Sequence, residues 1–315
     1  MKRILLDCDP GIDDSTAILF AIKSGALHVE AITTVSGNLT ADRTCANALK
    51  TLELLDVDDI PVSQGTLHPL VRPFPRDPFS HGDDGLGNTA LPPPRLQPTG
   101  SFGPDVIVDT VNRYLGEITL VATGPLTNVA VALTKDPSLA KKVQRLVVIG
   151  GAFGFNRWAY TYATGDNPAS EWNIFVDPEA AKMVFESGMP ITAIGLDVAV
   201  HPDINFRPEH IARLEASSRR EASYLLELIR FVRDRKFESY CVLIDSLAIA
   251  AAIDPSVIET RSIHVGIETE GQLTRGQTVA DIRANFRWTH LPLIDAACDV
   301  DYPRFMNMLI DAITA

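Results

Sequence analysis

The sequence predicts an α/β fold: an open, mainly parallel β-sheet with flanking helices. Short apolar runs alternate with segments of helical periodicity along the 315 residues, and such alternation is typical of βαβ units. Gly, Pro and Asp residues separate many of these segments, where strands end and helices begin. Apolar residues make up 46% of the chain and charged residues 22%, so the chain can bury a large core, which excludes a disordered or fibrous class.

The N-terminal part of the chain shows the alternation clearly. Its predicted elements are a strand at 3–8, a helix at 13–24, a strand at 28–35, a helix at 40–55 capped by Thr40, and a strand at 60–62. The following stretch, 65–103, is rich in Pro, Gly, Asp and His and is too long for a plain connection. We therefore expect it to be a functional loop.

The same alternation resumes after this stretch. The predicted elements are strands at 117–122, 145–149 and 191–196, helices at 125–133, 178–187, 208–236, 245–252 and 303–313, and a late hairpin of 263–267 with 278–282. Residues 152–171 form a second irregular stretch that is aromatic and contains glycine. Because the sequence has no internal repeat and no low-complexity linker, we expect a single domain over 1–315.

Charge and cysteine usage limit the partners and the compartment. The formal net charge is −12, which repels a phosphate backbone or an anionic lipid surface, so no nucleic acid and no membrane is expected as a partner. No apolar run approaches a membrane span, and Asp7 and Asp9 interrupt the apolar start before a secretory signal can form. The four cysteines are scattered and form no CxxC pair, which favours a reducing compartment, the cytoplasm.

Acidic residues cluster where the first predicted strand ends. Asp7, Asp9, Asp13 and Asp14 lie within one eight-residue stretch, and four carboxylates so close together must be neutralised by protons, hydrogen bonds or a cation. Capping of a helix explains Asp13 and Asp14 without any metal. It does not explain Asp7 and Asp9, which lie inside or at the end of a buried strand.

Other polar residues follow further predicted strands or begin a helix. They are Asn38, Thr123 with Gly124, and Asp245. In open α/β sheets, ligands bind beyond the carboxyl ends of the strands, so these residues are expected to gather there. Carboxylate, carbonyl and hydroxyl oxygens suit a hard divalent cation, and Ca²⁺ is the ion predicted.

Four motifs occur in order along the chain. They are DCDPGIDD at 7–14, AITTVSGN at 31–38, VATGPLTN at 121–128 and EWNIFVDPEAA at 171–181. Together with His81 and Gly82 in the early loop and Asp245 in a late helix, they resemble the signatures of the nucleoside hydrolases, the inosine-uridine preferring family of ribohydrolases. The resemblance covers nearly the whole chain and implies a Rossmann-like nucleoside hydrolase fold.

The resemblance also implies a role for each residue. Asp9, Asp14, Asp245 and the backbone carbonyl of Thr123 would hold Ca²⁺, and Asp9 would also be the catalytic general base that activates water. The substrate-binding residues would be Asp13 and Asn38 for ribose hydroxyls, Asn173 for the 3′-hydroxyl, Glu171 for the 5′-hydroxyl and His81 for the base. The implied reaction is calcium-dependent hydrolysis of the N-glycosidic bond of ribonucleosides in nucleoside salvage, by a homodimer or homotetramer.

One position departs from the family. Many members carry His, and some Trp, directly before the late Asp, as a proton donor or stacking group for the departing base, whereas this chain has Ile244. Ile can do neither, so preference between purine and pyrimidine ribosides stays open. Three aromatic residues of the second irregular stretch either stack on a nucleobase or pack the loop itself: Trp158, Tyr160 and Tyr162.

Two alternatives remain. An Asp-x-Asp after a first strand also occurs in haloacid-dehalogenase-like phosphatases, but Pro10 and Gly11 replace the Thr or Val expected after the second Asp. The other alternative is a ribose- or nucleoside-binding protein of the same fold with little or no turnover, which the loss of a leaving-group acid at Ile244 makes conceivable. Measuring release of free base from inosine and uridine, with and without calcium, separates these possibilities.

Overall fold

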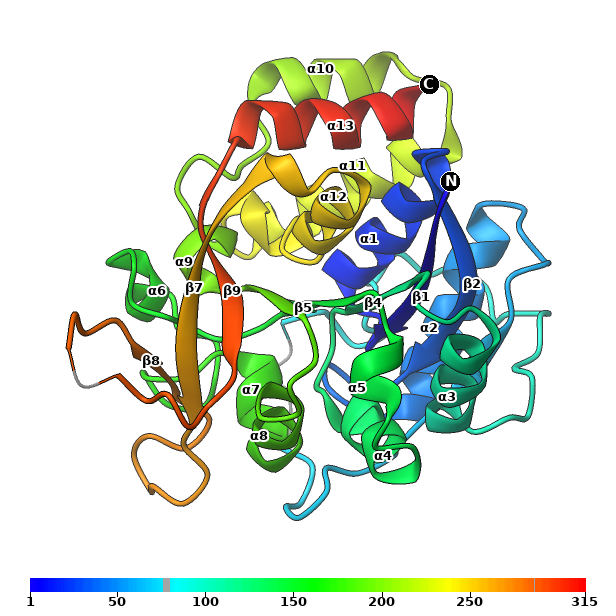
Figure 1. Ribbon diagram of the computed structural model, residues 1–315. Coiled ribbons are helices and arrows are strands. Elements are labelled where there is room, and N and C mark those ends of the chain that lie inside the picture. The colour runs from blue at the N-terminus through cyan, green and yellow to red at the C-terminus, as the bar shows by residue number, and fades with distance from the viewer. Residues whose placement is uncertain (76–79, 286) are drawn as a thin grey trace.

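The fold is built on one nine-stranded sheet with the strand order β3-β2-β1-β4-β5-β6-β9-β7-β8. The computed structural model describes residues 1–75, 80–285 and 287–315. The six strands that come first in the chain are parallel to one another: β1 (Lys2–Cys8), β2 (Leu27–Thr34), β3 (Val62–Gln64), β4 (Ile118–Ala122), β5 (Arg145–Ile149) and β6 (Ile191–Ile194). This arrangement confirms the predicted open, mainly parallel sheet (Figure 1).

The C-terminal end of the chain completes the sheet with mixed pairing. Strand β9 (Leu293–Val300) is parallel to β6, while β7 (Ile258–Ile267) is antiparallel to both β9 and β8 (Thr278–Asp281). The predicted late hairpin is therefore present as β7 and β8, with His264 opposite Asp281. Strand β7 starts earlier than expected, and β9 is an additional strand that inserts between β6 and β7.

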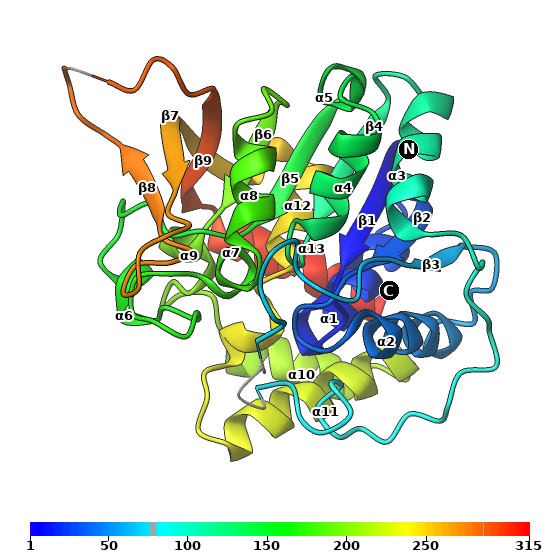
Figure 2. The same ribbon diagram turned by 90° about the horizontal axis from the view of Figure 1, so that it is seen from below.

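Helices cover both faces of the sheet because side chains alternate along each strand. In β1, Ile4, Leu6 and Cys8 belong to one hydrophobic core and Leu5 belongs to another. The first core is covered by α1 (Ile12–Lys23), α2 (Ala41–Leu54), α10 (Pro208–Ala216), α11 (Arg220–Asp234), α12 (Ser246–Ile253) and α13 (Tyr302–Thr314). Helices α3 (Gly103–Arg113), α4 (Thr127–Lys135), α5 (Leu139–Lys142) and α8 (Pro178–Phe185) cover the second (Figure 2).

Five short helical segments lie in the connections. They are α6 (Trp158–Thr161), α7 (Trp172–Val176), α9 (Leu196–Ala199), η1 (Ser239–Val242) and η2 (Pro255–Val257). Because α6 lies within the stretch 152–171, that stretch is less irregular than the sequence predicted. Helix α7 begins directly after it.

The cap of α2 differs from the prediction. Thr40 occupies the N-cap position, but its side chain makes no capping hydrogen bond. Instead, Ser36 Oγ accepts a hydrogen bond from the backbone N–H of Ala41 at 2.8 Å. The turn after β2 thus caps the helix through a residue four positions further upstream, which also fixes the turn that carries Asn38.

None of the helices in the described part of the chain is long and apolar enough to cross a membrane.

Candidate active site

The sequence-predicted residues meet at the carboxyl ends of the central strands. In the parallel register, Asp7 of β1 lies beside Thr33 of β2 and Ala122 of β4, so the turns that follow these strands are neighbours. Asp9 and Asn38 lie in two of these turns, and Asp14 lies in the first turn of α1 directly after β1. The fold therefore brings together motifs that are more than a hundred residues apart.

Asp14 is held by four hydrogen bonds. Its Oδ2 accepts the backbone N–H of Gly11 at 3.0 Å and Asn38 Nδ2 at 3.1 Å. Its Oδ1 accepts Thr123 Oγ1 at 2.7 Å and the backbone N–H of Asp9 at 3.3 Å. These donors come from three different strand-end turns, so the Asp14 carboxylate ties the turns together and cannot rotate freely.

Asp9 is enclosed by glycine turns on both sides. The backbone N–H of Asn38 donates to Asp9 Oδ2 at 2.6 Å, while Asp9 Oδ1 is buried and accepts no hydrogen bond from the described residues. A Cβ atom at Gly37 would lie 2.0 Å from Asp9 Oδ2, and one at Gly124 would lie 2.7 Å from Asp9 Oδ1. Glycine is therefore required at both positions for the carboxylate to fit, and one of its oxygens is left for a ligand.

Three buried carboxylates face each other beside Asp9. One oxygen each from Asp13, Asp14 and Asp245 lies within 4.8 Å of the others. Within residues 1–75, 80–285 and 287–315, no lysine or arginine forms a salt bridge with Asp9, Asp14 or Asp245. A buried cluster of carboxylates fits a hard divalent cation, because the cation can balance their negative charge. The predicted ligand Asp245 is thus in the cluster, and Asp13, predicted to bind ribose, lies there too.

The surroundings disfavour ionisation of Asp9 and Asp245. Burial raises the pKa of Asp9 well above its ordinary value, and the negative charge of Asp14 raises it further. Burial also raises the pKa of Asp245, and the charges of Asp13, Asp14 and Asp9 add to this effect. A positive charge at the centre of the cluster would reverse both effects, because it stabilises the ionised carboxylates.

Glu171 and Asn173 form the wall after β5. Glu171 caps α7 by accepting the backbone N–H groups of Asn173 at 2.9 Å and Ile174 at 3.1 Å, and it also accepts Gly151 N–H at 3.2 Å. Burial raises the pKa of Glu171 to about 7 against these hydrogen bonds. Asn173 Nδ2 donates to the backbone carbonyl of Thr123 at 2.7 Å. The predicted sugar ligand Asn173 and the predicted metal ligand Thr123 are therefore in direct contact.

His81 reaches the site from the early loop. The backbone N–H of Ile12 donates to His81 Nδ1 at 3.2 Å, and the same nitrogen lies 3.8 Å from Asp13 Oδ1. A Cβ atom at Gly11 would lie 2.5 Å from His81 Nδ1. The imidazole therefore lies over the start of α1, beside the carboxylate cluster.

Aromatic and aliphatic side chains pack next to Asp245. Ile244, Tyr240 and Trp158 are partly buried against a small core formed by Ala152, Ala159, Leu196 and Val200. Trp158 Nε1 donates to the carbonyl of Asp197, and its ring meets His201 edge-on at 4.4 Å between centroids.

The other two aromatic residues of this stretch are similarly exposed but differ in their contacts, and Tyr160 is 38% exposed. Tyr160 donates to the carbonyl of Ala152 at 3.3 Å. Tyr162 is 43% exposed and lies 6.1 Å from the Tyr240 ring. Trp158 and Tyr160 thus anchor the loop by hydrogen bonds, whereas Tyr162 packs beside Tyr240.

Two supporting carboxylates were not predicted as site residues. Asp7 Oδ1 accepts Thr33 Oγ1 at 2.6 Å and Asn128 Nδ2 at 2.7 Å, which ties β1 to β2 and α4. Asp197 accepts backbone N–H groups of the loop 153–156 at 2.6 to 3.2 Å. Asp197 directly follows the predicted strand at 191–196, so the same strand-end signal that marks Asp9 could have found it.

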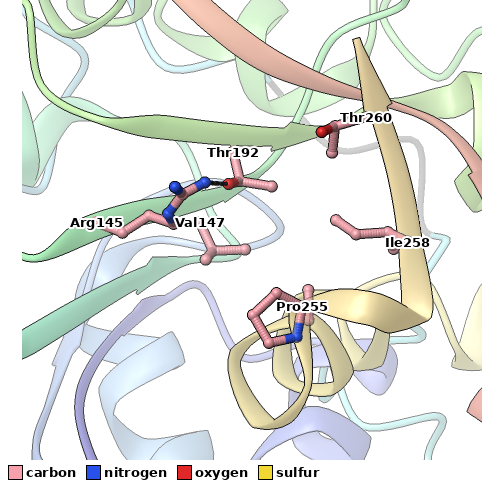
Figure 3. Close-up of a pocket in the computed structure, with 7 residues that line it drawn as sticks. Arg145, Val147, Thr192, Pro255, Ile258 and Thr260 are labelled. Atoms are coloured by element: carbon pink, nitrogen blue, oxygen red, sulfur yellow. Dashed lines mark hydrogen bonds between the residues drawn. The ribbon is translucent and has the colours of Figure 1, made fainter. Parts of the chain in front are cut away.

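A separate cavity of about 100 Å³ lies beside the first residues of β5 and β6. Figure 3 shows Arg145 and Thr192 hydrogen-bonded to each other on one side of this cavity, with Pro255 and Ile258 on the other. Asp9 and Asn38 instead follow the carboxyl ends of β1 and β2, so the cavity is not part of the carboxylate site.

The profile of the inosine-uridine preferring nucleoside hydrolases matches residues 4–307. The chain belongs to this family. It is therefore a hydrolase that acts on N-glycosyl bonds, and the resemblance found in the four motifs is confirmed. Among curated proteins, it is 38% identical over 313 residues to the pyrimidine-specific ribonucleoside hydrolase RihA of Escherichia coli O9:H4 (strain HS), covering 98% of this chain and 97% of the relative.

Solved structures of nucleoside hydrolases share the fold over the whole chain. The plant nucleoside hydrolase PpNRh1 has a TM-score of 0.87 at 34% identity and covers 100% of this chain and 99% of its own. A purine-preferring ribonucleoside hydrolase from Gardnerella vaginalis has a TM-score of 0.86 at 31% identity, with coverage of 99% and 98%. Since these similar proteins include a pyrimidine-specific and a purine-preferring hydrolase, membership of the family does not determine the preferred base.

Proposed function

We propose that this chain is a calcium-dependent ribonucleoside hydrolase that releases ribose and a free nucleobase, with residues 1–315 acting as a single domain. The observation that carries the proposal is the buried cluster of Asp13, Asp14 and Asp245 next to Asp9, in a chain of the nucleoside hydrolase family. The ribonucleoside hydrolases named among its relatives support ribonucleosides as substrates.

The residues that would hold Ca²⁺ are Asp9, Asp14, Asp245 and the backbone carbonyl of Thr123. Asp9 Oδ1, which accepts no hydrogen bond from the described residues, fits such an ion. When bound, Ca²⁺ would lower the pKa of the attacking water and hold the ribose 2′- and 3′-hydroxyls. The Asp14 carboxylate is fixed by hydrogen bonds from three turns, so it would not have to rearrange to bind Ca²⁺. Such preorganisation favours affinity for the ion.

Asp9 is the proposed general base. Its carboxylate is fixed by the Asn38 N–H and by the two glycine turns, so it is presented without rotation to accept the proton of the attacking water. As the glycosidic bond breaks, positive charge develops on the ribose. The surrounding carboxylates stabilise this charge, because they are already oriented in a buried site.

The ribose contacts are proposed from the same geometry. Asp13 and Asn38 would bind hydroxyls from the α1 side, and Asn173 would bind the 3′-hydroxyl from its place against the Thr123 carbonyl. Glu171 would bind the 5′-hydroxyl, and its neutral form at pH values below about 7 can also donate a hydrogen bond. His81 would contact the nucleobase from above α1.

The test is hydrolysis of uridine and inosine, followed as equal amounts of ribose and free base. Losing a hydroxyl bound to a charged partner costs roughly 1.5–3 kcal/mol, so 2′-deoxyuridine should react at least ~10-fold more slowly than uridine. Asp9→Asn should abolish release of ribose from both substrates while it leaves the protein folded. Binding of uridine without any release of ribose would instead support the alternative of a nucleoside-binding protein.

Three further properties belong to the proposal. All four cysteines carry free thiols, which fits a reducing compartment such as the cytoplasm. A role in nucleoside salvage follows if the products are free base and ribose. Assembly as a homodimer or homotetramer is proposed from the resemblance to the nucleoside hydrolase family.

A further inference from the structure

Arg235 joins the end of helix α11 to the early loop. Its Nη1 donates a hydrogen bond to the backbone carbonyl of Ser80 at 3.0 Å. The guanidinium carbon lies 5.0 Å from the centroid of the Phe231 ring and 5.3 Å from that of the Phe237 ring. Two cation–π contacts therefore orient the planar group toward the loop, and a planar group held in this way loses little freedom when it binds a carbonyl.

The loop packs directly against the same helix. A Cβ atom at Gly82 would lie 3.2 Å from Phe231 Cζ, and one at Gly87 would lie 3.0 Å from Leu228 Cδ2. Both glycines have positive φ angles, 81° and 67°, so the tight turn and the close approach require glycine for two reasons. The backbone from 80 to 88 is thus in contact with α11 at several points.

This loop segment carries His81 into the site. The backbone N–H of Gly87 donates to the carbonyl of His81 at 2.9 Å, and the His81 ring accepts the Ile12 N–H at the start of α1. The carbonyl that Arg235 binds belongs to Ser80, the residue directly before His81. A displacement of Ser80 would therefore move the His81 imidazole relative to Asp13.

We infer that Arg235 is a positioning residue that acts through His81. Arg235 holds the loop so that the His81 imidazole stays over α1, where the imidazole contacts the substrate. This inference rests on the proposed function only in that His81 contacts the nucleoside. Arg235 itself contacts the loop backbone and two aromatic rings.

A double-mutant cycle tests this inference. Because a misplacement of about 1 Å can cost 10²-fold in rate, Arg235→Ala should lower kcat/KM for uridine or inosine by about 10- to 100-fold. Arg235→Lys should restore part of this loss, because an ammonium group can also donate to the Ser80 carbonyl. In the His81→Ala background, Arg235→Ala should cause less than about a 2-fold further loss. An equal loss in both backgrounds would overturn the inference.

The matched control is Arg233→Ala. Arg233 lies in the last turn of α11, two residues before Arg235, but donates to the carbonyl of Phe206 at 2.9 Å. We expect kcat/KM to stay within about 2-fold of the wild-type value for this variant. A loss as large as that of Arg235→Ala would show that any disturbance of α11 suffices, and this would contradict a specific role for Arg235.

A measurement without substrate separates this inference from the proposed function. In the substrate-free protein, the NMR signals of the His81 imidazole, assigned with His81→Ala, should shift in Arg235→Ala and stay unchanged in Arg233→Ala. Unchanged His81 signals in Arg235→Ala would overturn the positioning role even if nucleosides are hydrolysed. Failure of the wild-type protein to release ribose would count against the proposed function, while the NMR comparison still decides the role of Arg235.

Discussion

At the scale of single residues, Asp9 and Asp14 have distinct surroundings although both are buried. Asp14 accepts four hydrogen bonds from three turns, whereas Asp9 accepts one, from the Asn38 N–H. The four bonds fix the orientation of the Asp14 carboxylate, whereas burial raises the pKa of Asp9. Asp14 is thus suited to a fixed ligand, and Asp9 is suited to taking up and releasing a proton.

Glu171 gives a prediction on pH and stability. Burial raises its pKa from its usual 4.5 to about 7, so between these values the folded protein holds a proton that the unfolded chain has released. In chelator, the free energy of unfolding should therefore fall as pH rises from 5 to 7, by at most about 1.4 kcal/mol per pH unit for this group.

The contribution of Glu171 can be separated from that of other groups. Glu171→Gln should make the fall in unfolding free energy with pH less steep, because the amide does not titrate. Part of the pH dependence should remain, because burial also raises the pKa of Asp7 to about 7. Urea unfolding at pH 5, 6, 7 and 8 measures this, with Glu186→Gln on the surface as the control. Equal pH slopes for Glu171→Gln and the wild-type protein would contradict the assignment.

Ile244 gives a prediction on the leaving group. General acid assistance is commonly worth about 10²–10⁴ in rate, and Ile244, packed beside Tyr240 and Trp158, cannot supply a proton. A nitrophenyl riboside, whose leaving group needs no proton, should therefore react much faster than uridine or inosine. Ile244→His should narrow this gap, and Ile244→Leu should leave it unchanged.

Equal rates for inosine and the nitrophenyl riboside would contradict the prediction for Ile244. If inosine reacts as fast as the nitrophenyl riboside, another group supplies the proton. Selective loss of the inosine reaction in Tyr160→Phe or His81→Ala would then identify that group.

At the scale of elements, the turns after β2 and β4 shape the site through glycine. Gly37 and Gly124 lie on either side of the Asp9 carboxylate. A methyl group at Gly37 would lie 2.0 Å from Asp9 Oδ2 and 2.6 Å from Pro125 Cδ, so either the carboxylate or the turn must move. The two turns therefore set the position of the proposed general base as much as β1 does.

Gly37→Ala is the corresponding prediction. Overpacking of this kind typically costs about 1–3 kcal/mol of stability, and the displaced base should lower kcat about 10²-fold. Thermal unfolding and kcat for uridine measure the two effects. Gly266→Ala, where a Cβ atom would make an ordinary contact of 3.4 Å with Trp288, should change neither by a comparable amount. Wild-type kcat for Gly37→Ala would contradict the close approach.

Most strands of the parallel half could be predicted because they are apolar and end in Asp, Gly or Pro. The exception is β3 (Val62–Gln64), which begins at the last residue of the strand predicted at 60–62. Helix α3 and strand β9 could not be predicted in the same way. In α3, the β-branched residues Val106, Ile107 and Val108 lower the helix propensity. The Gly-Pro pair at its start is also typical of a loop. In β9, Asp295 and Asp299 interrupt the apolar pattern, and only pairing with β6 and β7 stabilises the strand.

The candidate site was predictable as a set of strand ends, but its internal contacts were not. Sequence placed Asp9, Asn38 and Thr123 at one edge of the sheet. It could not show that the Thr123 hydroxyl donates to Asp14, or that the Thr123 carbonyl accepts Asn173, since such contacts depend on the register between strands. For the same reason, the support that Asn128 gives Asp7 was not foreseen.

At the scale of the whole molecule, the site connects segments from both halves of the chain. Asp9 and Asp14 follow β1, Thr123 follows β4, and Asp245 precedes α12, which packs in the same core as α1. A cation held by all four would bind the folded state alone and would stabilise it by mass action. In its absence, buried carboxylates with raised pKa values would destabilise this junction.

The most direct test is therefore ribose release from uridine and inosine before and after exhaustive chelation, followed by addition of Ca²⁺. Chelation should abolish the activity and lower the melting temperature, Ca²⁺ should restore both, and in Asp14→Ala Ca²⁺ should restore neither. Full activity and an unchanged melting temperature after chelation would contradict the assignment of a calcium site to the carboxylate cluster.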